Sequence, residues 1–107
     1  MQASPLASPL LLDVDTAHAL ADTFRLLGDP TRVRIVHALA EGELCVCDIA
    51  ERAAISESAA SHQLRLMRAQ RLVRGRRAGR CVYYTLDDQH VLSLFQQALR
   101  HVTEDGR

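Results

Sequence analysis

The stretch between residues 45 and 84 constrains the fold of this chain most, because it combines two helical patterns with two β-prone runs. Apolar residues at helical spacing predict a first short helix with one buried face. That face contains Val46, Ile49, Ala50 and Ala53. A turn over residues 54–56 follows, and Ser56 suits the N-cap of the next helix because its hydroxyl can accept a hydrogen bond from a free backbone N–H. That second helix is predicted to reach about Gln70, with an inward stripe of Ala60, Leu64 and Met67.

Two β-prone runs come next, at residues 72–73 and 81–84, and they flank a predicted turn at residues 77–79. A helix-turn-helix followed by a basic hairpin is the pattern of a winged helix. In that fold the second helix enters the major groove of DNA and the hairpin, or wing, lies along the phosphate backbone. The sequence therefore predicts a DNA-binding module.

The outward face of the second helix carries small polar, imidazole and guanidinium groups, which are suited to contacts with phosphates and base edges. The candidate DNA-binding residues on this helix are Ser58, Ser61, His62, Gln63 and Arg65. Those on the wing are Arg76, Arg77 and Arg80, which we expect on phosphates.

The distribution of charge supports the same interpretation, although the formal net charge of the 107 residues is zero. Residues 57–80 contain seven arginines and one acid, whereas residues 1–56 carry a net charge of −4 and residues 81–107 one of −2. Positive charge concentrated on one element is typical of a nucleic-acid surface. The alternative is a solvated arginine-rich face in a chain that has no lysine.

The segments outside this stretch predict three more helices around the same core. We expect a loose tail over residues 1–12 and one domain over residues 13–107. Asp15 or Thr16 could cap a first helix, Asp29 a second, and Asp87 or Asp88 the last. The predicted fold is mainly α with a small β-hairpin, in the order α-α-α-α-β-β-α. The last helix has a wide apolar stripe from Val91 to Val102, which predicts a homodimer built from the first and last helices.

The last helix also carries four side chains that could bind a metal ion. They are Asp88, His90, His101 and Glu104. The two histidines are about 16 Å apart along one helix, at ~1.5 Å per residue, and therefore cannot share an ion within one chain. Two such helices packed antiparallel would bring each Asp/His pair to the partner's His/Glu pair, in a set suited to tetrahedral zinc. The alternative is that these histidines and acids are simply solvated.

Cysteines form a weaker candidate for a second metal site. Cys45 and Cys47 lie beside Asp48, and His18 could add a ligand from the first helix. The alternative is that these cysteines are small buried residues at a helix start. Cys81 lies in a strand-like run, where we expect it to pack.

Other features narrow the class of protein. Three cysteines are an odd count, which favours a reduced compartment over a disulfide framework. The chain contains no apolar run of membrane-spanning length and no secretory signal, so we expect a soluble cytoplasmic protein without a membrane partner. It contains no nucleophile elbow, phosphate-cradling loop or HExxH motif, so we expect neither enzyme activity nor a small organic substrate.

These motifs together resemble the ArsR/SmtB family of bacterial metal-sensing repressors over about residues 16–104. The resemblance rests on LGDPTR at 27–32, ELCVCD at 43–48, SAASHQL at 58–64, and RAGR at 77–80 with YY at 83–84. It implies a homodimer with metal-controlled operator binding. Family members that sense zinc or cobalt use Asp-x-His, ten residues and His-x-x-Glu/His on the last helix, and Asp88, His90, His101 and Glu104 fit that spacing.

The family's cysteine sites fit this chain less well. The arsenite type continues to a third cysteine where this chain has Ala50, and the cadmium and lead type adds cysteines from an N-terminal arm that contains none here. The sequence therefore favours a repressor that binds operator DNA as an apo dimer and releases it when Zn²⁺ fills the last-helix sites, with Co²⁺, Ni²⁺ or Cd²⁺ as alternatives. One competing hypothesis is a repressor switched by Cys45 and Cys47, through thiol oxidation or a thiophilic ion. Another is a zinc buffer without an operator.

Overall fold

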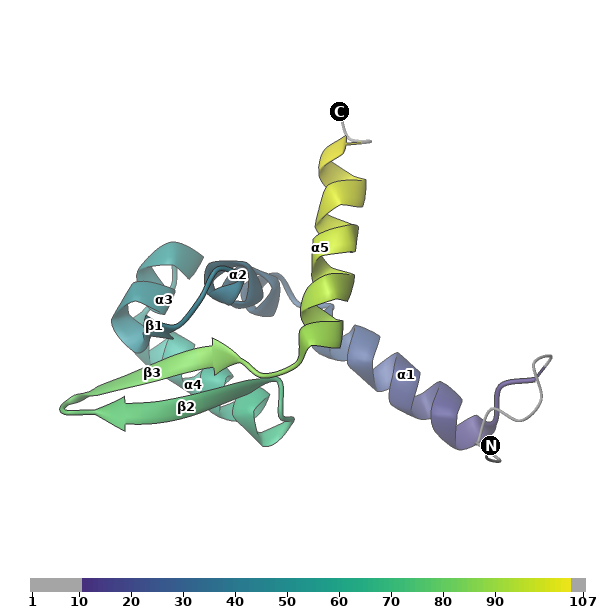
Figure 1. Ribbon diagram of the computed structural model, residues 1–107, viewed down its shortest axis with the longest axis horizontal. Coiled ribbons are helices and arrows are strands. Elements are labelled where there is room, and N and C mark those ends of the chain that lie inside the picture. Colours follow the sequence, from purple (N-terminus) through teal and green to yellow (C-terminus); the bar gives the residue numbers. More distant parts are fainter. Residues whose placement is uncertain (1–10, 105–107) are drawn as a thin grey trace.

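The computed structural model describes residues 11–104 and has the predicted helices and hairpin in the predicted order, with one additional short strand (Figure 1). The elements are α1 (Val14–Leu27), α2 (Pro30–Leu39), β1 (Leu44–Cys45), α3 (Val46–Ala53), α4 (Glu57–Ala69), β2 (Val73–Ala78), β3 (Cys81–Leu86) and α5 (Gln89–Glu104). Residues 1–10 of the predicted tail, and residues 105–107, lie outside the described residues.

Side-chain caps explain where most of the helices begin. Asp29 accepts a hydrogen bond from Arg32 N at 3.0 Å and Ser56 accepts one from Ala59 N at 3.0 Å, as predicted. The prediction for α1 was wrong by two or three residues. Its N-cap is Asp13, whose carboxylate accepts a hydrogen bond from the backbone N–H of Thr16 at 2.6 Å.

The three strands form one antiparallel sheet in the order β1-β3-β2. Ala78 pairs with Cys81, so the wing turn consists of Gly79 and Arg80. The predicted turn at residues 77–79 was therefore too early, because the φ angle of +63° that the turn needs falls on Gly79 while Arg77 still belongs to β2. The sequence did not predict β1, because two residues are too few for an alternating pattern to be visible.

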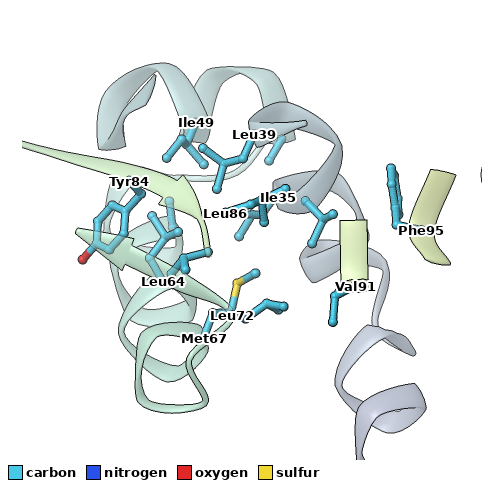
Figure 2. Packing of buried hydrophobic residues seen from close by; sticks show 14 of the residues in the cluster. Ile35, Leu39, Ile49, Leu64, Met67, Leu72, Tyr84, Leu86, Val91 and Phe95 are labelled. Carbon is cyan, nitrogen blue, oxygen red and sulfur yellow. The ribbon is translucent and has the colours of Figure 1, made fainter. Parts of the chain in front are cut away.

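The hydrophobic core lies between α2, α3, α4, the hairpin and the first turns of α5 (Figure 2). The predicted inward stripe of α4 is confirmed, since Ala60, Leu64 and Met67 are all fully buried. On α3 the predicted face is also buried, except that Val46 is half-buried. Val91 and Phe95 anchor the start of α5 to this core.

The helices α1 and α5 extend away from the helix-turn-helix and the wing (Figure 1). No residue of α1 is buried, and on α5 only Val91 and Phe95 are buried. Apolar side chains of both helices line a groove of about 340 Å³, and several of them are exposed to solvent. Phe24 is 54% exposed and Val102 is 62% exposed. A groove of this kind is the surface that the sequence predicts for a dimer interface.

Candidate nucleic-acid interface and metal sites

The outward face of α4 presents the predicted DNA-contacting side chains. Burial of Ala60, Leu64 and Met67 fixes the rotation of this helix about its axis. The opposite face is therefore turned to solvent, and it carries the exposed Ser58, His62 and Arg65 with the half-buried Ser61 beside them. This is the face expected of a recognition helix.

Gln63 differs from these neighbours because its side chain already has a partner. Its Oε1 accepts a hydrogen bond from Arg32 Nε at 3.1 Å, and Gln63 is half-buried. The bond connects α4 to α2. A contact between Gln63 and DNA would compete with it, so we expect Gln63 to position α4 more than to read bases.

A groove of about 360 Å³ separates α4 from the wing and has guanidinium groups on both walls. Arg65 and Arg68 line it from α4, and Arg76 and Arg77 line it from β2. Cationic side chains on two facing elements suit a phosphate backbone that passes between them.

Among the wing arginines, Arg76 is held within the protein. Its Nε and Nη2 donate to the two carboxylate oxygens of Glu43, at 2.7 and 2.8 Å. Its guanidinium carbon also lies 5.0 Å from the centre of the Tyr83 ring. The paired hydrogen bonds lower the pKa of Glu43 and raise the pKa of Arg76. Among the described residues, the side chains of Arg77 and Arg80 make no hydrogen bond or ion pair within the protein, and both residues are exposed.

The four predicted ligands on α5 lie at the two ends of the helix. At its start, Asp88 Oδ1 is 3.7 Å from His90 Nδ1 and also accepts hydrogen bonds from the backbone N–H groups of His90 and Val91. At its end, Glu104 Oε2 lies 3.6 Å from Arg100 Nε, and His101 is exposed. Within residues 11–104 the only cluster of three or more potential metal ligands is elsewhere, so a single chain does not assemble a site on α5. The shared site stays a prediction.

That cluster is at the start of α3. Cys45, Cys47 and Asp48 have ligand atoms within 4.8 Å of one another, and the two sulfurs are 2.9 Å apart. A hydrogen bond with Cys45, together with nearby negative charge, raises the pKa of Cys47 to about 11. His18 of the same chain is not part of this cluster.

Cys81 does not pack in the core as the sequence suggested. It is the first residue of β3, next to the wing turn, and its side chain is exposed. Alternation along β3 instead buries Tyr84 and Leu86, which lie closer to the helices. The expectation of a packing role was therefore wrong.

Comparison with known proteins identifies the family. The chain is 50% identical over 96 residues to the transcriptional repressor SmtB homolog of Synechocystis sp. (strain ATCC 27184 / PCC 6803 / Kazusa), covering 90% of this chain and 73% of that protein. The chain belongs to the ArsR/SmtB family. A family model described as bacterial regulatory protein, arsR family, also matches this ArsR/SmtB protein over residues 29–74.

Two further relatives agree with this assignment. The ArsR/SmtB protein is 45% identical over 86 residues to the cadmium resistance transcriptional regulatory protein CadC homolog of Staphylococcus aureus, covering 79% of this chain and 71% of that protein. The crystal structure of the AntR antimony-specific transcriptional repressor superposes with a TM-score of 0.85 at 31% identity, covering 97% of this chain and 98% of that one. The protein is accordingly a metal-sensing transcriptional repressor that binds operator DNA as a homodimer. None of its described helices is long and apolar enough to cross a membrane.

Proposed function

We propose that this ArsR/SmtB repressor binds its operator as an apo dimer and releases it when a zinc ion fills each of two sites between the α5 helices. One observation supports this proposal most: each end of α5 has a histidine close to a carboxylate. Asp88 and His90 lie at the start of the helix, and His101 and Glu104 lie at its end. We expect the protein to act in the cytoplasm, where its operator DNA is, and to have no enzymatic role.

The donor set determines which ions suit these sites. Each site would have two imidazole nitrogens and two carboxylate oxygens, a set that favours zinc or cobalt and also accepts nickel and cadmium. The two pairs of one chain are about 16 Å apart along the helix, so each pair needs the opposite pair of a second α5 that runs antiparallel. The exposed apolar groove beside α5 gives the second chain a reason to pack there.

The junction between the wing and α5 provides a route from these sites to DNA. Asp88 is both a proposed ligand and the residue that caps α5, because its Oδ1 accepts hydrogen bonds from His90 N and Val91 N. Ligation of this carboxylate would therefore act directly on the cap of α5. The adjacent Asp87 accepts a hydrogen bond from Arg74 of β2 at 2.6 Å. A change at Asp88 therefore acts one residue away from a contact that holds the wing.

DNA recognition in this proposal is divided between the two elements. Ser58, Ser61, His62 and Arg65 face the major groove, while Arg77 and Arg80 contact phosphates. Because linkage is reciprocal, the operator must weaken zinc binding by the same factor by which zinc weakens operator binding.

The test replaces His101 with alanine and uses Gln97→Ala as the matched control. Gln97 is exposed and lies on the same face of α5, between the two histidines, but its amide is a poor zinc ligand. Operator binding is followed by fluorescence anisotropy with and without zinc, and dimer formation by sedimentation. We expect His101→Ala to bind the operator normally without zinc and to lose zinc-driven release, while Gln97→Ala behaves as wild type.

A cysteine switch is the second candidate, and the 2.9 Å separation of the Cys45 and Cys47 sulfurs favours it. Normal zinc-driven release by His101→Ala, with none by a Cys45→Ser/Cys47→Ser double variant, would transfer the switch to α3. Thiol oxidation is the weaker form of this candidate, because a raised pKa keeps Cys47 in its less reactive thiol form at neutral pH. A zinc buffer without an operator does not agree with membership of a family of transcriptional regulators.

A further inference from the structure

The side chain of Arg32, on α2, joins the end of α1 to the recognition helix α4. Its Nε donates a hydrogen bond to Gln63 Oε1 of α4 at 3.1 Å, and its Nη1 donates one to the backbone carbonyl of Leu26 in α1 at 3.4 Å. Arg32 is half-buried, and it lies 31 positions from Gln63 in the sequence. One guanidinium group therefore contacts both a helix that lines the exposed apolar groove and the helix that faces DNA.

The Leu26 carbonyl is a group that α1 cannot satisfy by itself. In a continuing helix it would accept a hydrogen bond from the N–H four residues later, but that residue is Pro30, which has no N–H. An arginine side chain near the C-terminus of a helix can bond to its last carbonyls and interacts favourably with the negative end of the helix dipole. The contact with Arg32 therefore fixes the end of α1 against α2.

Arg32 is itself held firmly enough to act as a joint. The carboxylate of Asp29, the N-cap of α2, accepts a hydrogen bond from the backbone N–H of Arg32 at 3.0 Å. A guanidinium group is planar and its donors point in fixed directions, so the bonds to Gln63 and Leu26 together set its orientation. Lysine has one side-chain nitrogen on a flexible stem and cannot reproduce this arrangement. The joint needs the shape of arginine as well as its charge.

We propose that Arg32 is a positioning residue for operator binding, which fixes the orientation of α4 relative to α1. In a dimer built on the groove between α1 and α5, α1 is held against the partner chain, and the Arg32 joint transmits that position to α4. The two recognition helices of a dimer must meet half-sites about one turn of DNA, ~34 Å, apart. A loose joint would let the two α4 helices move out of register with these half-sites.

The experiment compares three duplexes of equal length: the operator, the operator with one base pair inserted between its half-sites, and random DNA. The insertion separates and rotates the half-sites but leaves the sequence of each half-site intact. Fluorescence anisotropy measures affinity in the absence of metal, so the result does not depend on the function proposed for α5. Sedimentation and thermal unfolding verify that each variant is a folded dimer.

Arg32→Met keeps most of the aliphatic stem and removes both donors. We expect it to bind the operator about 10-fold more weakly, the size of loss expected for a hydrogen bond from a charged donor. The matched control is Arg34→Met, because Arg34 is an exposed arginine on the same helix and its removal changes the charge equally. Arg32→Met should bind the inserted and random duplexes as well as this control does. Arg32→Lys should lose as much operator affinity as Arg32→Met.

Gln63→Met tests the other end of the joint and keeps the proposal testable if the Arg32 variants do not fold. It should reproduce the selective loss on the operator, and the double variant Arg32→Met/Gln63→Met should be no weaker than either single variant, because all three lack the same bond. A double variant whose loss is the product of the single losses would overturn the proposal, since the two residues would then act independently. Equal losses on all three duplexes, or normal operator binding by Arg32→Lys, would overturn it as well, because the charge alone would then account for the effect.

Discussion

The ion pair between Arg76 and Glu43 leads to a quantitative prediction about the wing. A cationic side chain that contacts a DNA phosphate releases a counterion, and each such contact contributes about 0.9 to the slope of log affinity against log salt concentration. Arg77 has no ion pair among the described residues, whereas Arg76 already donates two hydrogen bonds to Glu43. The two arginines, adjacent in sequence, should therefore differ in how much salt dependence they provide.

The magnitude follows from the dimer. Each arginine occurs twice, so Arg77→Ala removes two phosphate contacts and should reduce the slope by about 1.8. Across a fourfold rise in salt, the wild type should then lose about 12-fold more affinity than Arg77→Ala does. Arg80→Ala should behave in the same way. Arg76→Ala should reduce the slope by less than about half of this value.

Glu43→Gln provides the converse test, because it removes the carboxylate that holds Arg76. The released guanidinium becomes available to a phosphate, so the slope should become steeper than that of the wild type. Anisotropy titrations of operator and random duplexes at several salt concentrations measure all four variants. If Arg76→Ala flattens the slope as much as Arg77→Ala, and Glu43→Gln leaves it unchanged, the pair does not persist on DNA and the assignment is wrong.

Two further predictions concern the recognition helix and the dimer. Ser61→Ala and His62→Ala should lose more affinity for the operator than for random DNA, because base-edge contacts carry sequence information and phosphate contacts do not. The same anisotropy titrations measure this difference. Equal losses of affinity on both duplexes would contradict the roles given to α4. Leu99→Glu places a carboxylate in the apolar groove between α1 and α5 and should weaken dimerisation by about 100-fold, corresponding to roughly 3 kcal/mol. Sedimentation over a range of concentrations measures this effect, and an unchanged dimer would move the interface away from the groove.

The amino-acid sequence alone determined the local architecture of this protein. Hydrophobic spacing and a few capping residues predicted the helices, the buried stripe of α4 and the hairpin, because these signals act over one or two turns of chain. The concentration of arginine over residues 57–80 predicted the DNA-binding surface for a similar reason, since those side chains lie on two consecutive elements. The ligand set proposed for α5 was visible in the sequence because Asp88 directly precedes this helix and the other three residues lie on it.

Only the tertiary structure decided which of these side chains already have a partner within the protein, and which residues distant in sequence come into contact. Arg76 pairs with Glu43 across 33 positions and Gln63 with Arg32 across 31, and both partners come from outside the helix-turn-helix and wing pattern. The same holds for β1, whose two residues pair with Tyr83 and Tyr84 of β3. Contacts of this kind depend on how α2, α3 and the sheet pack around Ile35, Leu64 and Tyr84. A local pattern does not encode them, because their geometry is fixed by the burial of residues that are far apart in the chain.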